Sequence, residues 1–440
     1  MKRHQKIGKC VPVGIILLFV GTSIIPSIAQ VTEKPGVPSF VGEWLYVGGS
    51  GPGNYSNITT ALRNATDGDT IYVYSGIYTE DVNFLEINVS ISLIGESNLS
   101  TIINHTSFWF NTSNIFLTGF WFQNSSTIYI ASIYGNEVSH NSVTNSIFTN
   151  LSSGIMIENS SYNTIVNNQF YQCGIFLGAY LTFYLYPFAP EYDDSTNTIF
   201  DNMVNGKPLV YREDDHDQTI SDAGEIILLR CSNITITHTN FGSVLSLIEL
   251  IQTTDVKVTD NDFNNTIIAL FNSSENTIAE NRFSPISDGS QLNGLVLFGP
   301  STGNDITNNV FSHESTIFIF NSSHNLFKRN DFYGSQFRFS GPLILFMDAD
   351  NTWQRNYWMR PRILPKIILG AKSSSAPSKL SQISLDVDWR PTLKPNNPKP
   401  EWVYDDMQIE RKMSYPWITT MSFLHLNPSY WRSTIPQAFR

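Results

Sequence analysis

The chain has 440 residues, of which 15% are charged, and its 38 acidic residues outnumber its 27 basic residues, giving a formal net charge of −11 at pH 7. This balance, with no basic stripe along the chain, argues against a nucleic-acid partner. Asparagine, serine and threonine supply the polarity instead, which suits an exported protein better than a cytosolic enzyme.

Residues 1–29 are predicted to be a signal peptide. Four basic side chains precede an apolar run over residues 11–28, and Ser27-Ile28-Ala29 before Gln30 has the small-x-small pattern of a cleavage site. The alternative is an uncleaved membrane anchor, because the apolar run approaches the roughly 17–20 residues that span a bilayer. The cleavage pattern favours removal, so we expect the mature chain to begin at Gln30 and to be secreted or held at the cell surface.

Residues 30–45 are interpreted as a linker, after which a short helix is predicted. Apolar residues recur at helical spacing over residues 58–65, and Asn57 is placed to cap the helix N-terminus. A helix here would cover the apolar end of the domain that follows. Glu80 and Asp81, which come after the next strand-like runs, are interpreted as turn residues.

Residues 46–358 return repeatedly to one template, Asn-x-Ile-x-x-Asn-x-Phe, which is clearest at residues 276–283. Further copies or near-copies begin at Asn163, Asn233, Asp255, Asn304, Asn325 and Asn351. Several neighbouring copies, such as those at 233, 255 and 276, lie 21 or 22 residues apart. A period in the low twenties is typical of a stacked solenoid.

The residue types of the template indicate which solenoid it is. The alternating apolar residues suit a short strand, and the flanking Asn suits a corner because it tolerates left-handed backbone torsions. Stacked coils would place like residues above one another, giving Asn ladders at the corners and Ile and Phe ladders inside. The sequence therefore predicts an all-β protein, a single-stranded right-handed parallel β-helix of about 12 coils.

These copies, with the segment Asn205–Tyr211 and the segment Arg355–Trp358, resemble NosD-type (periplasmic copper-binding) right-handed parallel β-helix proteins of the pectin-lyase-like superfamily. The resemblance covers residues 46–391 and is specific for fold, but that fold hosts lyases, hydrolases, epimerases and non-catalytic binders. The family name implies copper. The eight His residues and the Met residues are scattered, however, without the spacing of a copper site.

Two segments interrupt the repeat and are candidate ligand-binding regions. The first, residues 174–194, carries Tyr180, Tyr184 and Tyr186. Insertions in β-solenoids emerge at turns and commonly build a binding face. The three tyrosines could line a glycan groove, or they could only extend and cover a sheet.

The second segment, residues 211–218, is the densest acidic cluster. Asp214, Asp215 and Asp217 could bind Ca²⁺ through their carboxylates, and with His216 they could supply acid–base chemistry. The Asp-Asp-His-Asp run resembles the acidic-His motif of alginate epimerases but lacks its Pro. A solvated loop is the favoured interpretation, since charge runs commonly face water. No other cofactor is indicated.

Outside these segments the sequence makes three smaller predictions. Cys173 and Cys231 are too few for a disulfide framework and are expected to be buried thiols. Residues 359–394 are predicted to form a cap or strap over the last coil. Residues 395–440 show no periodicity, and their structure is not predicted.

Two functions from different classes remain. The first is a secreted or cell-surface β-helix protein without catalysis, which binds a polysaccharide, a cell-surface glycan or a protein, or has a structural role. The second is a polysaccharide-active enzyme: a lyase, an epimerase or a hydrolase. An enzyme of this fold needs carboxylates and a basic residue converging across neighbouring coils, whereas the predicted outer strands carry Ser, Thr and Asn. The first function is therefore favoured.

Overall fold

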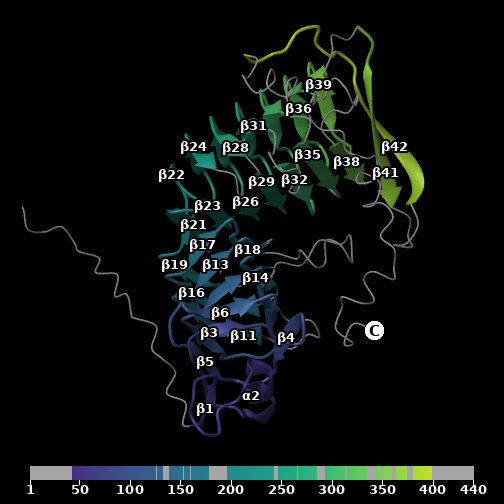
Figure 1. Ribbon diagram of the computed structural model, residues 1–440. Helices are drawn as coiled ribbons and strands as arrows, with labels where there is room; N and C mark the ends of the chain where they lie inside the picture. Colours follow the sequence, from purple (N-terminus) through teal and green to yellow (C-terminus); the bar gives the residue numbers. More distant parts are fainter. Residues whose placement is uncertain are drawn as a thin grey trace, which may run out of the picture. The chain divides into compact units, whose positions relative to one another are not determined.

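The computed structural model describes residues 42–398 except 125, 132–137, 152, 159, 178–195, 242–245, 265, 285–292, 313–314, 334–342, 348–349, 359–362 and 374–379. Its strands form an all-β, right-handed parallel solenoid of about 12 turns, which confirms the predicted fold class. Figure 1 shows the strands of successive coils stacked in chain order. Among the described residues, no helix is long and apolar enough to cross a membrane.

The N-terminal segment, from β1 to β20, stacks its strands in three parallel sheets and one short pair. The first sheet contains β1 (Trp44–Val47), β2 (Thr70–Val73), β5 (Ser92–Gly95), β8 (Phe116–Thr118), β12 (Ser142–Thr144), β16 (Thr164–Val166) and β19 (Thr198–Phe200). The second contains β3 (Gly76–Tyr78), β6 (Thr101–Asn104), β9 (Trp121–Gln123), β13 (Ile147–Thr149), β17 (Gln169–Tyr171) and β20 (Met203–Val204). The third contains β4 (Phe84–Ile87), β7 (Ser107–Phe110), β10 (Ile128–Ala131), β14 (Ile155–Glu158) and β18 (Ile175–Leu177), and the short pair is β11 (Val138–Ser139) with β15 (Ser160–Ser161).

The C-terminal segment, from β21 to β42, repeats the three-sheet arrangement. Its longest strands are β21 (Lys207–Glu213), β23 (Glu225–Leu229), β26 (Ser246–Ile251), β29 (Thr266–Phe271), β32 (Asn293–Phe298), β35 (Ser315–Phe320), β38 (Leu343–Met347) and β41 (Lys366–Ser373). The next sheet contains β22 (Thr219–Ile220), β24 (Thr235–Thr237), β27 (Lys257–Thr259), β30 (Thr277–Ala279), β33 (Asp305–Thr307), β36 (Leu326–Lys328), β39 (Thr352–Gln354) and β42 (Leu380–Asp388). The last contains β25 (Asn240–Phe241), β28 (Asp262–Asn264), β31 (Arg282–Ser284), β34 (Val310–Phe311), β37 (Asp331–Phe332) and β40 (Tyr357–Trp358).

The predicted inner ladders are present. In the C-terminal segment, Phe241, Phe263, Phe283, Phe311 and Phe332 stack with ring centroids 4.6–5.3 Å apart. The Ile column is equally regular, because Ile278 lies in register with Val258 below and Ile306 above. These side chains are fully or almost fully buried, so the repeated Ile and Phe of the template form the hydrophobic core.

Asparagine ladders run beside the apolar ones, but they lie inside the solenoid. Asn281, Asn309, Asn330 and Asn356 are each 0% exposed. In every step the backbone N–H of one Asn donates to Oδ1 of the next, at 2.9–3.0 Å. The left-handed torsion that the sequence predicts for the flanking Asn is found at Asn233 (φ 50°) and at the equivalent Asp255 (φ 59°). In the buried ladder it lies one residue earlier, whatever that residue is, as at Glu280 (φ 60°) and Arg329 (φ 55°).

Helix α2 (Ile58–Asn64) begins where the sequence predicts, and the Asn57 side chain accepts a hydrogen bond from Thr60 N at 2.8 Å. Glu80 lies between β3 and β4, in the turn that the sequence predicts, and its buried side chain has a structural role there. Glu80 is 8% exposed, and its carboxylate accepts from Ile58 N at 2.9 Å and from Thr59 N at 3.0 Å. A second acceptor therefore binds the helix N-terminus, from 22 residues further along the chain.

We expect Glu80→Ala to destabilise this end of the solenoid by about 2 kcal/mol, because it removes the acceptor of two backbone N–H groups at a helix start. Asp81→Ala is the matched control, since Asp81 is exposed and should change stability by less than about 0.5 kcal/mol. Amide hydrogen exchange at Ile58 and Thr59, with the urea unfolding midpoint, measures the effect. Equal exchange rates in the two variants would contradict this assignment of Glu80.

The parallel stack is interrupted between β20 and β21. Asn205 and Gly206 form a tight turn with φ angles of 54° and 78°, and β21 then runs antiparallel to β20. As a result β21 pairs in parallel with β23, and β18 is left as the end strand of its sheet. The outward apolar side chains of β23, β26 and β29, such as Ile227 and Phe271, join the core of the N-terminal segment. We call this contact the joint.

Two buried carboxylates bind the end strand at the joint. Glu225 Oε2 accepts from Ile175 N at 3.1 Å, and both oxygens of Glu249 accept from Leu177 N at 3.1 and 3.2 Å. Both glutamates are 0% exposed. Burial raises the pKa of Glu249 well above its usual value, and the charge of Glu225 raises it further. These acids thus take the place of a next strand on β18.

The last coil is completed by a hairpin of β41 and β42, which pair antiparallel from Lys366↔Asp388 onward. Asp388 ends one Asn ladder, because its Oδ2 accepts from Asn356 N at 3.0 Å and from Trp358 Nε1 at 3.0 Å. Asp331 holds the following segment, since its two oxygens accept from the backbone N–H groups of Asn396 and Asn397, each at 2.8 Å. Carboxylates therefore terminate the backbone hydrogen bonding at this end too.

Candidate functional site

The acidic turn follows directly from the geometry of β21. β21 and β23 pair in parallel register up to Glu213↔Leu229, so the residues that follow these two strands, Asp214 and Arg230, occupy equivalent corners of neighbouring coils. Both have left-handed torsions, with φ 51° at Asp214 and φ 53° at Arg230. The fold therefore places a cation directly beside the predicted cluster.

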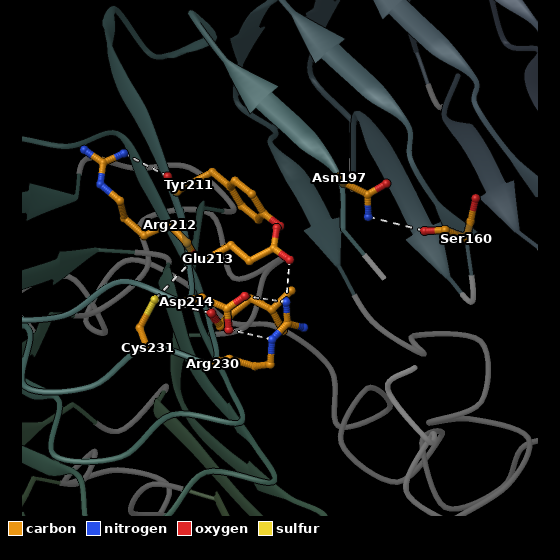
Figure 2. Close-up of polar contacts among 9 residues, drawn as sticks. Ser160, Asn197, Tyr211, Arg212, Glu213, Asp214, Arg230 and Cys231 are labelled. Atoms are coloured by element: carbon orange, nitrogen blue, oxygen red, sulfur yellow. Dashed lines mark hydrogen bonds and ion pairs between the residues drawn. The ribbon is translucent and has the colours of Figure 1, made fainter. Parts of the chain in front are cut away.

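Arg230 forms ion pairs with two carboxylates (Figure 2). Its Nε lies 2.8 Å from Asp214 Oδ1 and its Nη2 lies 3.0 Å from Asp214 Oδ2, while Nη2 also lies 2.5 Å from Glu213 Oε1. Tyr211 completes the group, because its hydroxyl donates to Glu213 Oε2 at 2.8 Å. The Glu213 and Arg230 side chains are 13% and 22% exposed, so this pair is largely withdrawn from water. We call these four residues the corner cluster.

The ionisation of the corner cluster follows from these contacts. The hydrogen bonds from Arg230 hold the pKa of Asp214 below its usual value. Burial and the hydrogen bond to Glu213 raise the pKa of the Tyr211 hydroxyl. The hydrogen bonds that Arg230 donates to Asp214 and Glu213 raise the pKa of its guanidinium. The cluster is therefore a network of paired charges.

The remaining acids of the turn diverge. Asp215 lies 3.5 Å from Arg212 Nε and also accepts from His216 N at 2.8 Å. Asp217 accepts from Asn233 Nδ2 at 2.5 Å and lies 2.8 Å from His216 Nδ1, and these hydrogen bonds, that of Asn233 first, lower its pKa. Asp214, Asp215 and Asp217 thus bind different partners, so the structure does not assemble the calcium site considered from the sequence.

The other predicted site residues are not brought to this cluster by any described contact. Tyr180, Tyr184 and Tyr186 lie outside the described residues. The His216 side chain is exposed and lies beside Asp217, and its backbone pairs with Ser232 of the next coil. Sequence reasoning missed Glu213 and Arg230, which are the most buried charges of the cluster. The available signal was the apolar strand Glu-Ile-Ile-Leu-Leu directly before Arg230, but the shortened coil, only 16 residues from Asp214 to Arg230, hides that register.

Backbone conformation explains the positions of four of the histidines. Four of them, His105, His140, His238 and His324, have φ angles of 52–60° and stand at left-handed corners of the solenoid. Within the described residues, no group of three or more His, Cys, Asp or Glu side chains could hold a metal ion.

The thiols of Cys173 and Cys231 are free and buried, as predicted, and burial raises the pKa of each. The described side chains do not fit a copper site.

We expect Arg230→Gln to lower the free energy of unfolding by about 2 kcal/mol, because it leaves the mostly buried carboxylate of Glu213 without a cation. The control is Arg212→Gln: this side chain is 47% exposed and 3.5 Å from Asp215, so its loss should cost less than about 1 kcal/mol. Urea unfolding followed by tryptophan fluorescence compares the two. Equal midpoints would show that Arg230 is not the structural cation of the cluster.

Comparisons with known proteins show what part of the chain is similar to. The family model described as periplasmic copper-binding protein (NosD) matches residues 214–361. Similar solved structures include the A-module of the Azotobacter vinelandii mannuronan C-5 epimerase AlgE6, at 11% identity over 67% of this chain and 93% of that chain, with a TM-score of 0.30. PfbA, a surface adhesin of Streptococcus pneumoniae, matches at 14% identity over 76% and 94%, with a TM-score of 0.27. No curated protein matches the chain significantly. Over residues 214–361 the chain is thus similar to NosD-type β-helix repeat proteins, as the sequence predicts.

Proposed function

We propose that this protein is an exported β-helix scaffold that binds a polysaccharide, a cell-surface glycan or a protein without transforming it. The observation that carries the proposal is the closure of the corner cluster. Arg230 pairs with both Glu213 and Asp214, at 2.5 and 2.8 Å, at the place where the sequence concentrates acid–base groups. The hydrogen bonds from Arg230 hold the pKa of Asp214 below its usual value, and a lowered pKa makes a carboxylate a weaker general base.

The buried carboxylates elsewhere support the same proposal. Glu80 binds the start of α2, Glu249 binds the edge of β18, and Asp388 terminates an Asn ladder. Each accepts hydrogen bonds from backbone N–H groups, which ties it to the architecture. These contacts indicate that the acids stabilise the fold and do not take part in a reaction.

One observation favours the alternative, a polysaccharide-active enzyme. Burial raises the pKa of Glu158, at the end of β14, to about 7. A carboxylic acid with such a pKa can act as a general acid near neutral pH. The described residues place no second carboxylate within hydrogen-bonding distance of it, so its role is tested directly below.

The test is a screen of the exported protein against acidic and neutral polysaccharides, with unsaturated products and reducing ends measured beside retention. Wild type, Asp215→Asn, Glu158→Gln and Tyr184→Ala are compared. We expect no turnover from any of them, and retention that weakens when a contact side chain is removed. Turnover by wild type that either acid substitution abolishes would make the protein an enzyme.

The proposed location rests on the predicted signal peptide and on the periplasmic family description. N-terminal sequencing of protein recovered outside the cytoplasm should find Gln30 as the first residue. Recovery of a chain that retains Met1 in the membrane fraction would show that residues 1–29 are an anchor.

A further inference from the structure

A cleft of about 640 Å³ opens at the C-terminal end of the solenoid, between β39 and the end of β42. Its lining comes from two stretches of the chain, residues 350–355 and residues 386–390. It is separate from the corner cluster, which lies at the start of the C-terminal segment. We call it the terminal cleft.

The floor of the terminal cleft is fixed by buried groups. Trp353 is 2% exposed, and its indole Nε1 donates to Asp386 Oδ2 at 2.9 Å. Asp388, two residues later, is 0% exposed and binds Asn356 and Trp358. The backbone on both sides of the cleft is therefore held in place, which limits the entropy lost when a ligand binds.

The rim of the cleft is exposed. Trp389 is 73% exposed, and Arg355 and Arg390 are exposed as well. In the part of the chain that the structure describes, neither of the two guanidiniums takes part in a salt bridge. The corner at Arg355 is anchored, because its carbonyl oxygen accepts from Asn396 Nδ2 at 3.1 Å. Acceptors line the same cleft at Asp350 and Gln354.

We propose that the terminal cleft is a saccharide subsite in which the Trp389 indole stacks on the apolar face of a pyranose ring. Aromatic rings contribute large contact areas at low entropic cost. Planar guanidinium, amide and carboxylate groups at Arg355, Gln354 and Asp350 can each form paired hydrogen bonds, which match adjacent sugar hydroxyls. The proposal rests on the proposed function and names a place where the glycan binds.

Neutral and uronic sugars share the pyranose ring that this cleft would bind, and the two arginines distinguish them. A uronate carboxylate would pair with a guanidinium in a bidentate manner, so its binding would weaken with added salt. A neutral sugar would bind through ring stacking and its hydroxyls, and this binding would depend little on salt. The probes are therefore cello-oligosaccharides and oligogalacturonates, within an array of neutral and uronic oligosaccharides.

The experiment measures the apparent Kd of the exported full-length protein for the glycan that it retains best. Trp389→Ala is the test variant and Trp44→Ala the matched control, since Trp44 is also exposed, at 55%, but lies on β1 at the other end of the solenoid. We expect Trp389→Ala to weaken binding about tenfold and Trp44→Ala to leave it unchanged. Arg390→Gln should also weaken binding, and most for a uronic ligand. Circular dichroism verifies that each variant is folded.

Retention that Trp389→Ala leaves unchanged would overturn the subsite while leaving the proposed function intact. Weakening by Trp44→Ala alone would do the same, and would move the binding surface to β1. No retention of any array glycan by wild type would contradict the subsite and the glycan-binding form of the proposed function together. The three failures are distinguishable because the wild type and both tryptophan variants are measured in parallel.

Discussion

Replacing Asn309 with alanine is expected to lower the free energy of unfolding by about 4 kcal/mol. The Asn309 side chain forms four hydrogen bonds in the interior. Its Oδ1 accepts from the backbone and side-chain nitrogens of Asn281, at 3.0 and 3.1 Å, while its Nδ2 donates to Ile278 O and to Asn330 Oδ1, at 2.7 and 3.1 Å. Alanine leaves these partners buried without water, and an unsatisfied buried group costs about 1–3 kcal/mol.

Two control variants separate the stability contributed by the Asn ladder from the general effect of a substitution in this coil. Asn309→Ser should cost less, because Ser146 occupies a ladder position naturally and accepts from Phe120 N at 3.4 Å. Asp305→Ala, on the exposed side of β33 in the same coil, should change stability by less than about 0.5 kcal/mol. Urea unfolding of the three variants ranks them by the free energy of unfolding that each one loses. If Asn309→Ala lost no more than Asp305→Ala, the buried ladder would not stabilise the solenoid.

The second large effect is expected at the joint, as a pH dependence. Burial and then the charge of Glu225 raise the pKa of Glu249 well above 4.5, its usual value. The folded protein therefore holds this proton more tightly than the unfolded chain does. Stability from Glu249 is complete below about pH 4.5 and is lost as the pH rises through the folded-state pKa. We expect wild type to lose stability over that window.

Substitutions at Glu249 separate the charge from the hydrogen bond. Glu249→Gln keeps an acceptor for Leu177 N and removes the titration, so its stability should fall less with rising pH than that of wild type. Glu249→Leu leaves the Leu177 N–H without its acceptor and should cost about 3 kcal/mol at low pH. Glu86→Gln, an exposed acid on β4, is the control. Unfolding midpoints measured across pH would contradict this account if wild type and Glu249→Gln fell in parallel.

Much of the fold could be predicted because the repeat places equivalent residues at equivalent positions. The Phe and Ile columns follow from side-chain alternation, and Asn57 capped α2 as its position before an apolar run implied. The left-handed corner was predicted correctly at Asn233 and Asp255, but in the buried ladder it lies one residue earlier. Asn tolerates that torsion, yet the ladder requires its side chain inside the solenoid, so residues such as Glu280 take the left-handed torsion instead.

The joint could not be predicted, because the repeat pattern of the sequence contains no signal for it. Glu225 and Glu249 bind a strand edge 50 and 72 residues away in the sequence. Acids on a strand are ordinarily expected to face water, and only the end of β18 gives them partners. The break itself was readable in part, since Asn205-Gly206 is a strong hairpin signal inside an otherwise parallel repeat.

The candidate site was predicted in composition but not in geometry. The sequence located the acids at 214–217, whereas their pairing depends on Arg230 one coil later. The terminal cleft has the same limitation, because its two stretches, 350–355 and 386–390, are brought together only by the β41–β42 hairpin. Alternation within a strand indicates burial, but it does not specify which distant strand end supplies a partner.

The most direct measurement of the central claim is a mass spectrum, together with a proton NMR spectrum, of the glycan recovered after it has bound to the exported wild-type protein. The account predicts that the oligosaccharide most strongly retained is released with its mass and its uronate stereochemistry unchanged. Cleaved, unsaturated or epimerised products, absent when Glu158→Gln or Asp215→Asn replaces wild type, would contradict it and establish catalysis.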